Sequence, residues 1–570
     1  MRRALGGLVA LLLVGACGAI PTSGPVTRVA DDVGLGESTV RYAPAKPSAG
    51  ASPQEIVLGY VDAMLAFPVS TATASAFLTP AAADKWRPLD GVRVYSSPSV
   101  SSAVPDRSSG GDTTGDRVVV RMSSTQVARL DRQGRYSRMG GDSELTYVLQ
   151  RVKGEWRIAT PQSGMLVSNK YFNDYFRPFE IYMFDRPGRR LVPVPVHLAV
   201  GEQLATSLVA SLAQGPVDEL GDLTRTYVPD LDTLSPSVPV SDGVADVQFD
   251  QELRSASESV QDHLSAQIVW TLRQVQEITG VRLTGGATVL APNGVPVQRI
   301  SSWGAYGPSA AGPRVYALSG NKAVEIEDGR VAPMTGAWGK DARGAELIAV
   351  GDAGVAGVLD GRDRVRVTNR AGSAARTFTG NQFVTPRWDR DGLLWLVDRA
   401  GGDTRVRVVR DDTIVELPIG TLAARDVSTF SLSPGGSRYA VTTDDAIYVG
   451  FVERDDKNQI LRLTDPQRLT VGTGTPTSAV WAGDTQLAYL AGSNLSRQVQ
   501  LIRIDGSAGD AGVSGGALLP NVGANDLVLG AGDPAARYAT DAKQRVWYLP
   551  PHGTWRLLKS AKITGLTSGR

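Results

Sequence analysis

The sequence predicts a multidomain protein in which two α+β domains precede an all-β domain built as a β-propeller. Three observations support this fold class. The chain has 570 residues, and at about 100–200 residues per domain this length suggests three or four domains. In the first half, helices followed by antiparallel strands over residues 54–170, and a compact β, α, β, α, β module over residues 177–292, are typical of α+β domains. In the second half a strand pattern repeats at about 45 residues, the length of a four-stranded propeller blade.

The chain begins with the features of a signal peptide over residues 1–16. Arg2 and Arg3 precede an apolar run over residues 4–14, which is too short to span a bilayer of about 30 Å as a helix but has the length of a signal-peptide core. The next residues, VGAC (14–17), resemble a bacterial lipobox. This resemblance implies cleavage after Ala16 and conversion of Cys17 into an N-palmitoyl, S-diacylglycerol cysteine.

Cys17 is the only cysteine of the chain, and it lies at the one place that a lipobox requires. The alternative is a chance cysteine in an ordinary signal peptide. Two or three acyl chains hold a protein stably on a bilayer, so we expect a lipid anchor on the extracytoplasmic face of the cell membrane. Residues 17–53 are rich in Pro, Ser, Gly and Ala and predict a flexible tether. No later apolar run is long enough for a transmembrane helix.

Residues 54–170 are expected to form the first α+β domain. The residues SPQE (52–55) are typical of a helix start, and apolar residues follow them at helical spacing. Strands are expected over residues 117–122, 145–152 and 154–160, the last two joined by a hairpin turn at Lys153-Gly154. The ending YVLQRVKGEWRIA (147–159) resembles the last hairpin of an NTF2-like cone. The resemblance implies a fold that can hold a ligand pocket, although no polar constellation identifies a ligand.

Residues 177–292 are expected to form the second α+β domain, with helices over residues 202–214 and 257–279. Gly215-Pro216 and Gly280 mark the ends of these helices. Strands are expected over residues 179–185, 191–200, 244–250 and 281–290. Four blocks resemble, in the same order, the GerM-type sporulation and germination domain: LAQGP (212–216), TYVPD (226–230), DGVADVQFD (242–250) and AQIVWTLRQVQEITGVRL (266–283). We therefore expect a GerM-like domain.

After a linker over residues 293–312, residues 313–562 predict a degenerate β-propeller. Four segments share a polar turn followed by an alternating apolar strand: WDRDGLLWLVD (388–398), LSPGGSRYAVTTDDAIYVGFV (432–452), WAGDTQLAYLAG (481–492) and DAKQRVWYLP (541–550). Six blades are favoured, and five to seven fit the length. We expect the end of the chain to close the ring by pairing with the segment near Val315. The alternative is a pair of β-sandwiches.

Composition excludes several classes of function. A net charge of +1 excludes a strongly basic nucleic-acid binder. One Cys and three His (His197, His263 and His552) leave too few ligands for a zinc site and no Cys–His catalytic pair. His263 is expected to be an interfacial residue of the long helix with no chemical role. We therefore expect no metal, no cofactor and no catalytic residue.

Three short motifs could suggest chemistry, and each has a simpler interpretation. DRDG (389–392) resembles part of a calcium loop but is expected to be a tight blade turn. GVSGG (512–516) matches G-x-S-x-G, yet it lies in a Gly-rich loop without the strand and helix that a nucleophile elbow needs. SGNK (319–322) matches S-x-x-K at a predicted hairpin turn. Four tryptophans are expected to pack between blades, with a binding face at a propeller end as the alternative: Trp388, Trp395, Trp481 and Trp547.

The order of lipobox, tether, α+β domain, GerM-like domain and propeller resembles the LpqB family of actinobacterial lipoproteins, from Cys17 to about Leu558. The resemblance implies an accessory lipoprotein of the MtrA–MtrB two-component system. Such a protein binds the extracellular domain of the MtrB-type sensor histidine kinase and modulates the control of cell-wall homeostasis and division. One alternative is a lipoprotein that binds or senses cell-wall glycan or a small molecule. Another is an enzyme on the propeller, for which His552 is the histidine available at the central mouth.

Overall fold

The computed structural model describes residues 41–106, 116–230, 234, 237–250, 253, 256–307, 314–410, 413–469, 475–493, 496–508, 524–529, 537–541, 543–550, 554–558 and 562–569. Ala16, Cys17, the GVSGG segment (512–516) and His552 lie outside these residues. The chain divides into two units, Met1–Arg41 and Tyr42–Arg570, and the second unit holds the helices and strands of all three domains. The predicted fold class is confirmed, because two α+β domains precede an all-β region.

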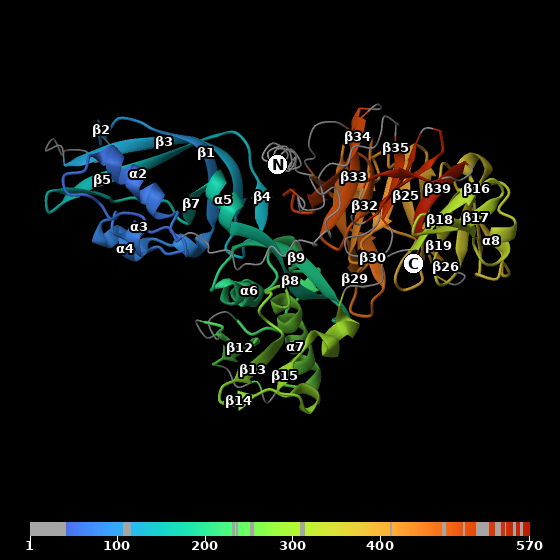
Figure 1. Ribbon diagram of the computed structural model, residues 1–570, viewed down its shortest axis with the longest axis horizontal. Helices are drawn as coiled ribbons and strands as arrows, with labels where there is room; N and C mark the ends of the chain where they lie inside the picture. The colour runs from blue at the N-terminus through green and yellow to red at the C-terminus, as the bar shows by residue number, and fades with distance from the viewer. Residues whose placement is uncertain are drawn as a thin grey trace, which may run out of the picture. The chain divides into compact units, whose positions relative to one another are not determined.

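The first domain packs three helices against one face of a twisted sheet (Figure 1). Its helices are α2 (Pro53–Ala63), α3 (Ala72–Ser75) and α4 (Pro80–Lys85). The sheet has the order β6-β5-β3-β1-β7, with β2 and β4 paired to β3. Its strands are β1 (Val92–Val100), β2 (Val104–Pro105), β3 (Arg117–Leu130), β4 (Tyr136–Arg138), β5 (Asp142–Val152), β6 (Glu155–Ile158) and β7 (Met165–Ser168).

Local signals of this domain behave as the sequence predicts. Ser52 and Glu55 form a capping box: the Ser52 hydroxyl accepts the Glu55 N–H at 3.3 Å, and the Glu55 carboxylate accepts the Ser52 N–H at 2.7 Å. Lys153 and Gly154 have φ of 53° and 85° and form the turn between β5 and β6. The predicted tether (residues 17–53) contacts this domain at Tyr42, which exchanges two backbone hydrogen bonds with Phe67.

The second domain places two small sheets around one apolar core. Helix α5 (Asn169–Tyr175) leads into the sheet β10-β8-β9, and the second sheet has the order β11-β12-β13-β14, with β15 paired to β13. Helix α7 (Glu258–Leu272) connects the parallel strands β12 and β13. The other elements are β8 (Phe176–Asp185), β9 (Leu191–Ala199), α6 (Leu204–Ala213), β10 (Thr224–Arg225), β11 (Val240–Ser241), β12 (Val244–Phe249), β13 (Gly280–Gly285), β14 (Thr288–Val289) and β15 (Val297–Gln298).

Two sequence expectations for this domain are wrong in detail. The long helix ends at Leu272 rather than at residue 279. Val275 and Ile278 remain buried, so turns after the helix continue its apolar spacing. The predicted strand over residues 281–290 is a hairpin, because β13 pairs with β14 across Gly286, whose φ is 58°. A glycine pair inside a strand pattern is a turn signal.

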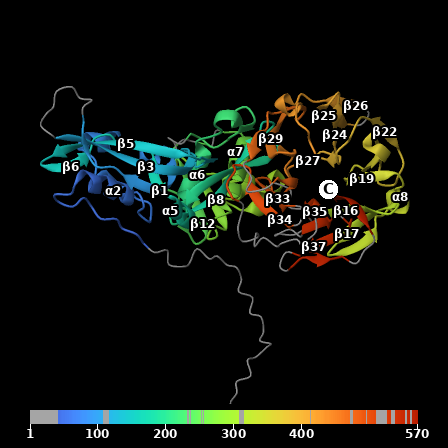
Figure 2. The ribbon, with the colours of Figure 1, turned by 90° about the horizontal axis from the view of Figure 1, so that it is seen from above.

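The described part of the remaining chain forms six antiparallel sheets around a common centre (Figure 2). Neighbouring sheets meet through their first strands. The number of blades stays the prediction that the sequence makes. The first two sheets contain β16 (Arg314–Ser319), β17 (Lys322–Glu327), β18 (Arg330–Pro333) and β39 (Ile563–Gly569), and then β19 (Ala345–Val350), β20 (Val355–Leu359), β21 (Arg364–Thr368) and β22 (Arg376–Thr379). The next two contain β23 (Arg387–Trp388), β24 (Leu394–Ala400), β25 (Asp403–Arg410) and β26 (Thr413–Glu416), and then β27 (Thr429–Leu432), β28 (Arg438–Thr442), β29 (Ile447–Arg454), β30 (Ile460–Leu463) and β31 (Gln467–Leu469). The last two contain β32 (Thr477–Trp481), β33 (Gln486–Ser493) and β34 (Ser496–Arg503), and then β35 (Ala524–Leu529), β36 (Arg537–Asp541), β37 (Val546–Leu549) and β38 (Arg556–Leu557).

The ring closes as predicted, because β39 pairs antiparallel with β16 and places Ser568 opposite Val315. Ile563 and Leu566 of β39 join an apolar cluster that also contains residues of β16, β17 and β35–β37. The closing strand therefore buries apolar surface between the first and the last sheet. Pairing of the two ends of the ring covers the edge of β16, and β39 becomes the end strand of that sheet.

The motif residues of the propeller have structural roles. The Asp389 carboxylate accepts the N–H groups of Asp391 and Leu393 and the indole N–H of Trp395, at 2.8, 2.9 and 3.0 Å. DRDG (389–392) is therefore a tight turn, as expected. Ser319 and Lys322 pair across a hairpin turn, which is not the helical spacing that S-x-x-K catalysis needs. Trp395 and Trp481 are buried as expected, whereas Trp388 and Trp547 are half-buried.

Candidate functional site

The hairpin between β8 and β9 carries the polar residues that meet the propeller. Asp185 at the end of β8 accepts the N–H groups of Arg189 and Arg190, at 2.7 and 3.0 Å, which fixes the turn. Nε2 of His263, on α7, lies 2.8 Å from the carbonyl oxygen of Gly188 at the tip. His263 thus lies between the long helix and this hairpin, as an interfacial residue that contacts the tip of the hairpin.

Two arginines and two aspartates alternate where this hairpin meets the propeller; we call this set the hairpin junction. Arg190 of the second domain pairs with Asp391 in the turn between β23 and β24. Arg454 of β29 lies 3.6 Å from both Asp391 and Asp389. The four side chains are at most 18% exposed. Burial by itself would raise the pKa of Asp391, but the hydrogen bond and charge of Arg190 lower it below its usual range.

A second buried arginine holds the same hairpin from the propeller side. The Arg438 guanidinium is completely buried, and this burial lowers its pKa to about 10, so it is charged at neutral pH. It donates to the carbonyl oxygens of Pro193, on β9, at 2.8 Å and of Asp484 at 3.3 Å, and it stacks on the Phe451 ring at 4.6 Å. These contacts partly compensate the burial of the charge, although its Nε has no hydrogen-bond partner among the described residues.

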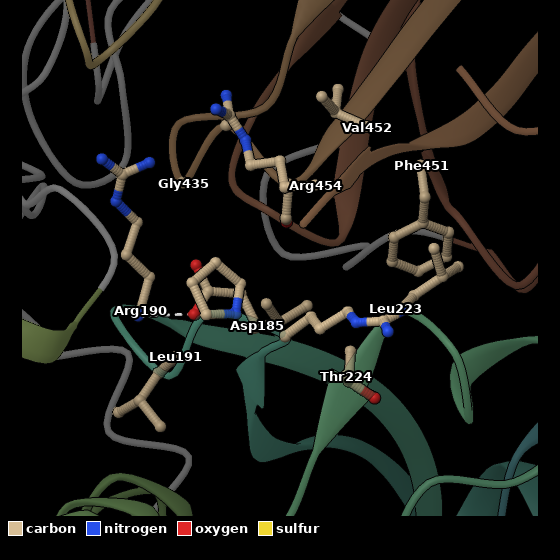
Figure 3. Close-up of a pocket in the computed structure, with 14 residues that line it drawn as sticks. Asp185, Arg190, Leu191, Leu223, Thr224, Gly435, Phe451, Val452 and Arg454 are labelled. Atoms are coloured by element: carbon tan, nitrogen blue, oxygen red, sulfur yellow. Dashed lines mark hydrogen bonds between the residues drawn. The ribbon is translucent and has the colours of Figure 1, made fainter. Parts of the chain in front are cut away.

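The space enclosed at the hairpin junction is small. Figure 3 shows side chains of the second domain, among them Arg190 and Leu223, facing Phe451 and Arg454 of the propeller. The cavity measures about 20 Å³, which is room for one water molecule and too little for an organic ligand. The contacts at the junction therefore position the two domains and leave little space between them.

The first domain is locked to the second by the tip between β3 and β4. Gln133 is buried, and its amide donates to the carbonyl oxygens of Ser211 and Gly215 at 2.8 and 2.9 Å. These carbonyls lie at the end of α6, where backbone acceptors lack helical partners. Arg135 bridges Asp131 at 2.7 Å and Asp218 at 2.5 Å. The tip thus caps a helix of the neighbouring domain.

His197 lies where residues of all three domains meet. It is 5% exposed, and its ring packs on Tyr136 and Phe172 with centroid distances of 5.0 and 5.8 Å. Its Nδ1 lies 3.7 Å from the Asp505 carboxylate of the propeller. Among the described residues, neither Nδ1 of His197 nor Oδ2 of Asp505 has a hydrogen-bond partner. Burial lowers the pKa of His197 although Asp505 opposes this shift, and the charge of Arg503 lowers it further.

Sequence reasoning gave these junction residues no role. Arg190, Arg438 and His197 occur in ordinary strand and turn patterns, and their partners lie far away in the chain. Within the described ranges no group of three or more His, Cys, Asp or Glu side chains could hold a metal ion. The predicted lipidation site at Cys17 lies outside those ranges.

Three family models match the chain in the order of its domains. The model of the N-terminal domain of lipoprotein LpqB matches residues 46–173, the sporulation and spore germination model matches residues 180–286, and the model of the LpqB beta-propeller domain matches residues 321–561.

Curated relatives named lipoprotein LpqB resemble nearly the whole chain. The relative from Thermobifida fusca is 29% identical over 561 residues and 88% of each chain. The relative from Rhodococcus opacus is 25% identical over 537 residues, 88% of this chain and 87% of its own. The relative from Mycobacterium bovis BCG is 25% identical over 548 residues, 88% of this chain and 89% of its own.

Similar solved structures include TolB from Acinetobacter baumannii, with a TM-score of 0.33, 10% identity, and coverage of 56% of this chain and 87% of that one. A virginiamycin B lyase from Staphylococcus aureus has a TM-score of 0.29, 14% identity, and coverage of 45% and 92%. At these TM-scores the two structures say nothing about what this chain does.

We predict that Arg190→Ala loosens the hairpin junction. The substitution leaves Asp391 with a weaker set of partners, and losing a charge-assisted hydrogen bond should speed local opening about tenfold or more. Hydrogen exchange of peptides covering residues 185–192 and 433–438 measures this effect. Arg189→Ala is the matched control, because this neighbouring side chain is exposed. Equal exchange in the two variants would contradict the role of Arg190.

We predict that acid weakens the packing around His197. Burial lowers the pKa of folded His197, so the unfolded chain, with a histidine pKa of about 6.5, binds the proton more tightly. The free energy of unfolding therefore falls as the pH falls through that value. Urea unfolding from about pH 7.5 to about pH 5.5 should show a smaller loss in His197→Phe, which keeps the ring packing. The same loss in both proteins would rule this mechanism out.

Proposed function

Because the chain belongs to the LpqB lipoprotein family, we propose that it is a lipid-anchored regulator of a two-component system. In this proposal it binds the extracellular domain of an MtrB-type sensor histidine kinase. Binding modulates signalling that controls cell-wall homeostasis and division. The curated relatives named lipoprotein LpqB support the coarser part, a membrane-associated lipoprotein.

Attachment at Cys17 fits this proposal. The lipobox VGAC (14–17) follows an apolar signal-peptide core and contains the only cysteine of the chain. Cleavage after Ala16 would leave Cys17 as the first residue of a protein that lies on the extracytoplasmic face. Within the part of the chain that the structure describes, no helix is long and apolar enough to cross a membrane.

One observation carries the binding role: polar and charged side chains, several of them buried, join the three domains. Arg190, Arg438 and Arg454 fix the second domain on the propeller, and Arg135 and Gln133 fix it on the first domain. A binding protein gains from such an arrangement, because surfaces held in fixed positions lose less entropy when a partner docks. The LpqB and germination-domain models that match the chain do not describe a known enzyme family.

The test is a titration of the soluble protein, residues 42–570, with the extracellular domain of the MtrB-type kinase from the same organism. We expect saturable binding with a Kd at or below about 10 µM, within the range of interfaces of ordinary size. Deleting single domains is a poor test, because it would expose the junction residues. Exposed apolar residues offer one probe per domain instead: Leu89→Asp, Val289→Asp and Ile414→Asp.

A substitution that weakens binding about tenfold or more assigns the contact to its domain, and the other two variants serve as its controls. Calorimetry and a competition assay with unlabelled protein give two independent readouts. Absence of binding at about 100 µM, well above the affinity of specific interfaces, would contradict the kinase proposal.

The anchor makes a separate prediction. Cys17→Ser removes the acyl acceptor, so the variant should accumulate as an unprocessed precursor or leave the membrane fraction. Fractionation of cells and mass spectrometry of the N-terminal peptide measure both outcomes. Gly18→Ala, which keeps the cysteine, is the control. Normal membrane retention of Cys17→Ser would sink the lipid-anchor assignment.

A further inference from the structure

Two arginines of the first domain lie directly opposite each other on neighbouring strands. β1 and β3 are antiparallel, and Arg93 is the register partner of Arg129. Cross-strand partners place their side chains on the same face of a sheet. The flanking residues Val94 and Leu130 are buried in the core, so the two arginines lie on the other face.

Neither guanidinium has a hydrogen-bond or ion-pair partner among the described residues. The two aspartates nearby are already engaged. Asp131 pairs with Arg135 at 2.7 Å, and Asp90 lies 3.5 Å from Arg132. Like charges directly opposite each other destabilise a sheet. The pair therefore presents two positive charges that no residue in the described part of the chain neutralises by an ion pair.

The arginines line an open hollow of about 410 Å³, a size typical of small-ligand sites. We call it the arginine hollow; its lining residues are Asp90, Gly91, Val92, Arg93, Arg129, Leu130, Asp131, Arg132, Ser163 and Gly164. Two of these are glycines at close backbone approaches. A Cβ on Gly91 would lie 2.5 Å from the Leu130 carbonyl oxygen, and a Cβ on Gly164 would lie 2.7 Å from that of Gly91.

We propose that the arginine hollow binds a phosphate monoester. A monoester carries nearly two negative charges at neutral pH and three strong acceptor oxygens. It can therefore neutralise both guanidinium groups and accept bidentate hydrogen bonds from each. A carboxylate carries one charge and would leave one of the two positive charges without compensation.

The same chemistry has two sources, a soluble sugar or glycerol phosphate and the headgroup of phosphatidate in a membrane. Glycerol 3-phosphate probes the first source. Vesicles that contain phosphatidate probe the second, with phosphatidylglycerol vesicles of equal surface charge as the diester control. Binding of one probe and not the other identifies the source, and both results support the site.

The experiment titrates each probe into the soluble protein, residues 18–570, and into the variants Arg93→Gln and Arg129→Gln. Each variant should bind at least about tenfold more weakly, because it loses charge-assisted hydrogen bonds. Arg121→Gln is the matched control, since Arg121 is an exposed residue of the same strand β3 and does not line the hollow. Thermal unfolding is a second readout, because a bound ligand raises the midpoint of the native protein alone.

Three results would overturn the proposal. The first is no binding of either probe at about 10 mM phosphate, a concentration far above that of specific ligands. The second is equal affinity of the native protein and the two arginine variants. The third is equal affinity for acetate and for glycerol 3-phosphate, which would show general attraction of anions. If both arginine variants unfold, a charge-retaining Arg93→Lys variant replaces them; affinity equal to that of the native protein would then count against bidentate recognition.

Discussion

A guanidinium buried between two domains sets the main constraint on this molecule. Arg438 is buried, and it contacts the Pro193 carbonyl, the Asp484 carbonyl and the Phe451 ring. The negative charges of Asp484 and Glu180 also favour its charged form. Of the three contacting groups, one belongs to the second domain and two belong to the propeller. While the domains stay packed, loss of one of these partners would leave a buried charge short of partners, which costs several kcal/mol. The position of the β8–β9 hairpin follows from this requirement, and Arg190 and His197 lie on that same hairpin.

Polar junctions of this kind select one arrangement more than they add stability. A buried ion pair is often no more stable than an apolar contact of the same volume. Its partners, however, must meet in one register, as Gln133 does with two carbonyl oxygens at the end of α6. A shift of this interface would break these hydrogen bonds, a constraint that an apolar contact lacks. For a protein proposed to act by binding, a fixed arrangement of surfaces is worth more than additional stability.

Sequence reasoning succeeded where a signal is local. Ser52 and Glu55 start a helix, Lys153-Gly154 turns a hairpin, and the strand near Val315 accepts the closing strand. It failed where apolar spacing continues past a helix, as at Val275, and where a glycine pair interrupts a strand. The junctions and the arginine hollow could not be predicted, because Arg190 and Asp391, or Arg93 and Arg129, meet only through tertiary register. A local sequence pattern does not predict which residues from distant parts of the chain come into contact.

The closing strand has a consequence for synthesis. β39 follows every other strand of the ring in the chain, yet it pairs with β16, the first. The ring cannot be completed until residues 563–569 have been made, so its folding depends on the integrity of everything between. A product that stops earlier keeps an unpaired edge on β16, and such an edge is a template for aggregation. Closure of the ring therefore requires a chain that extends through β39.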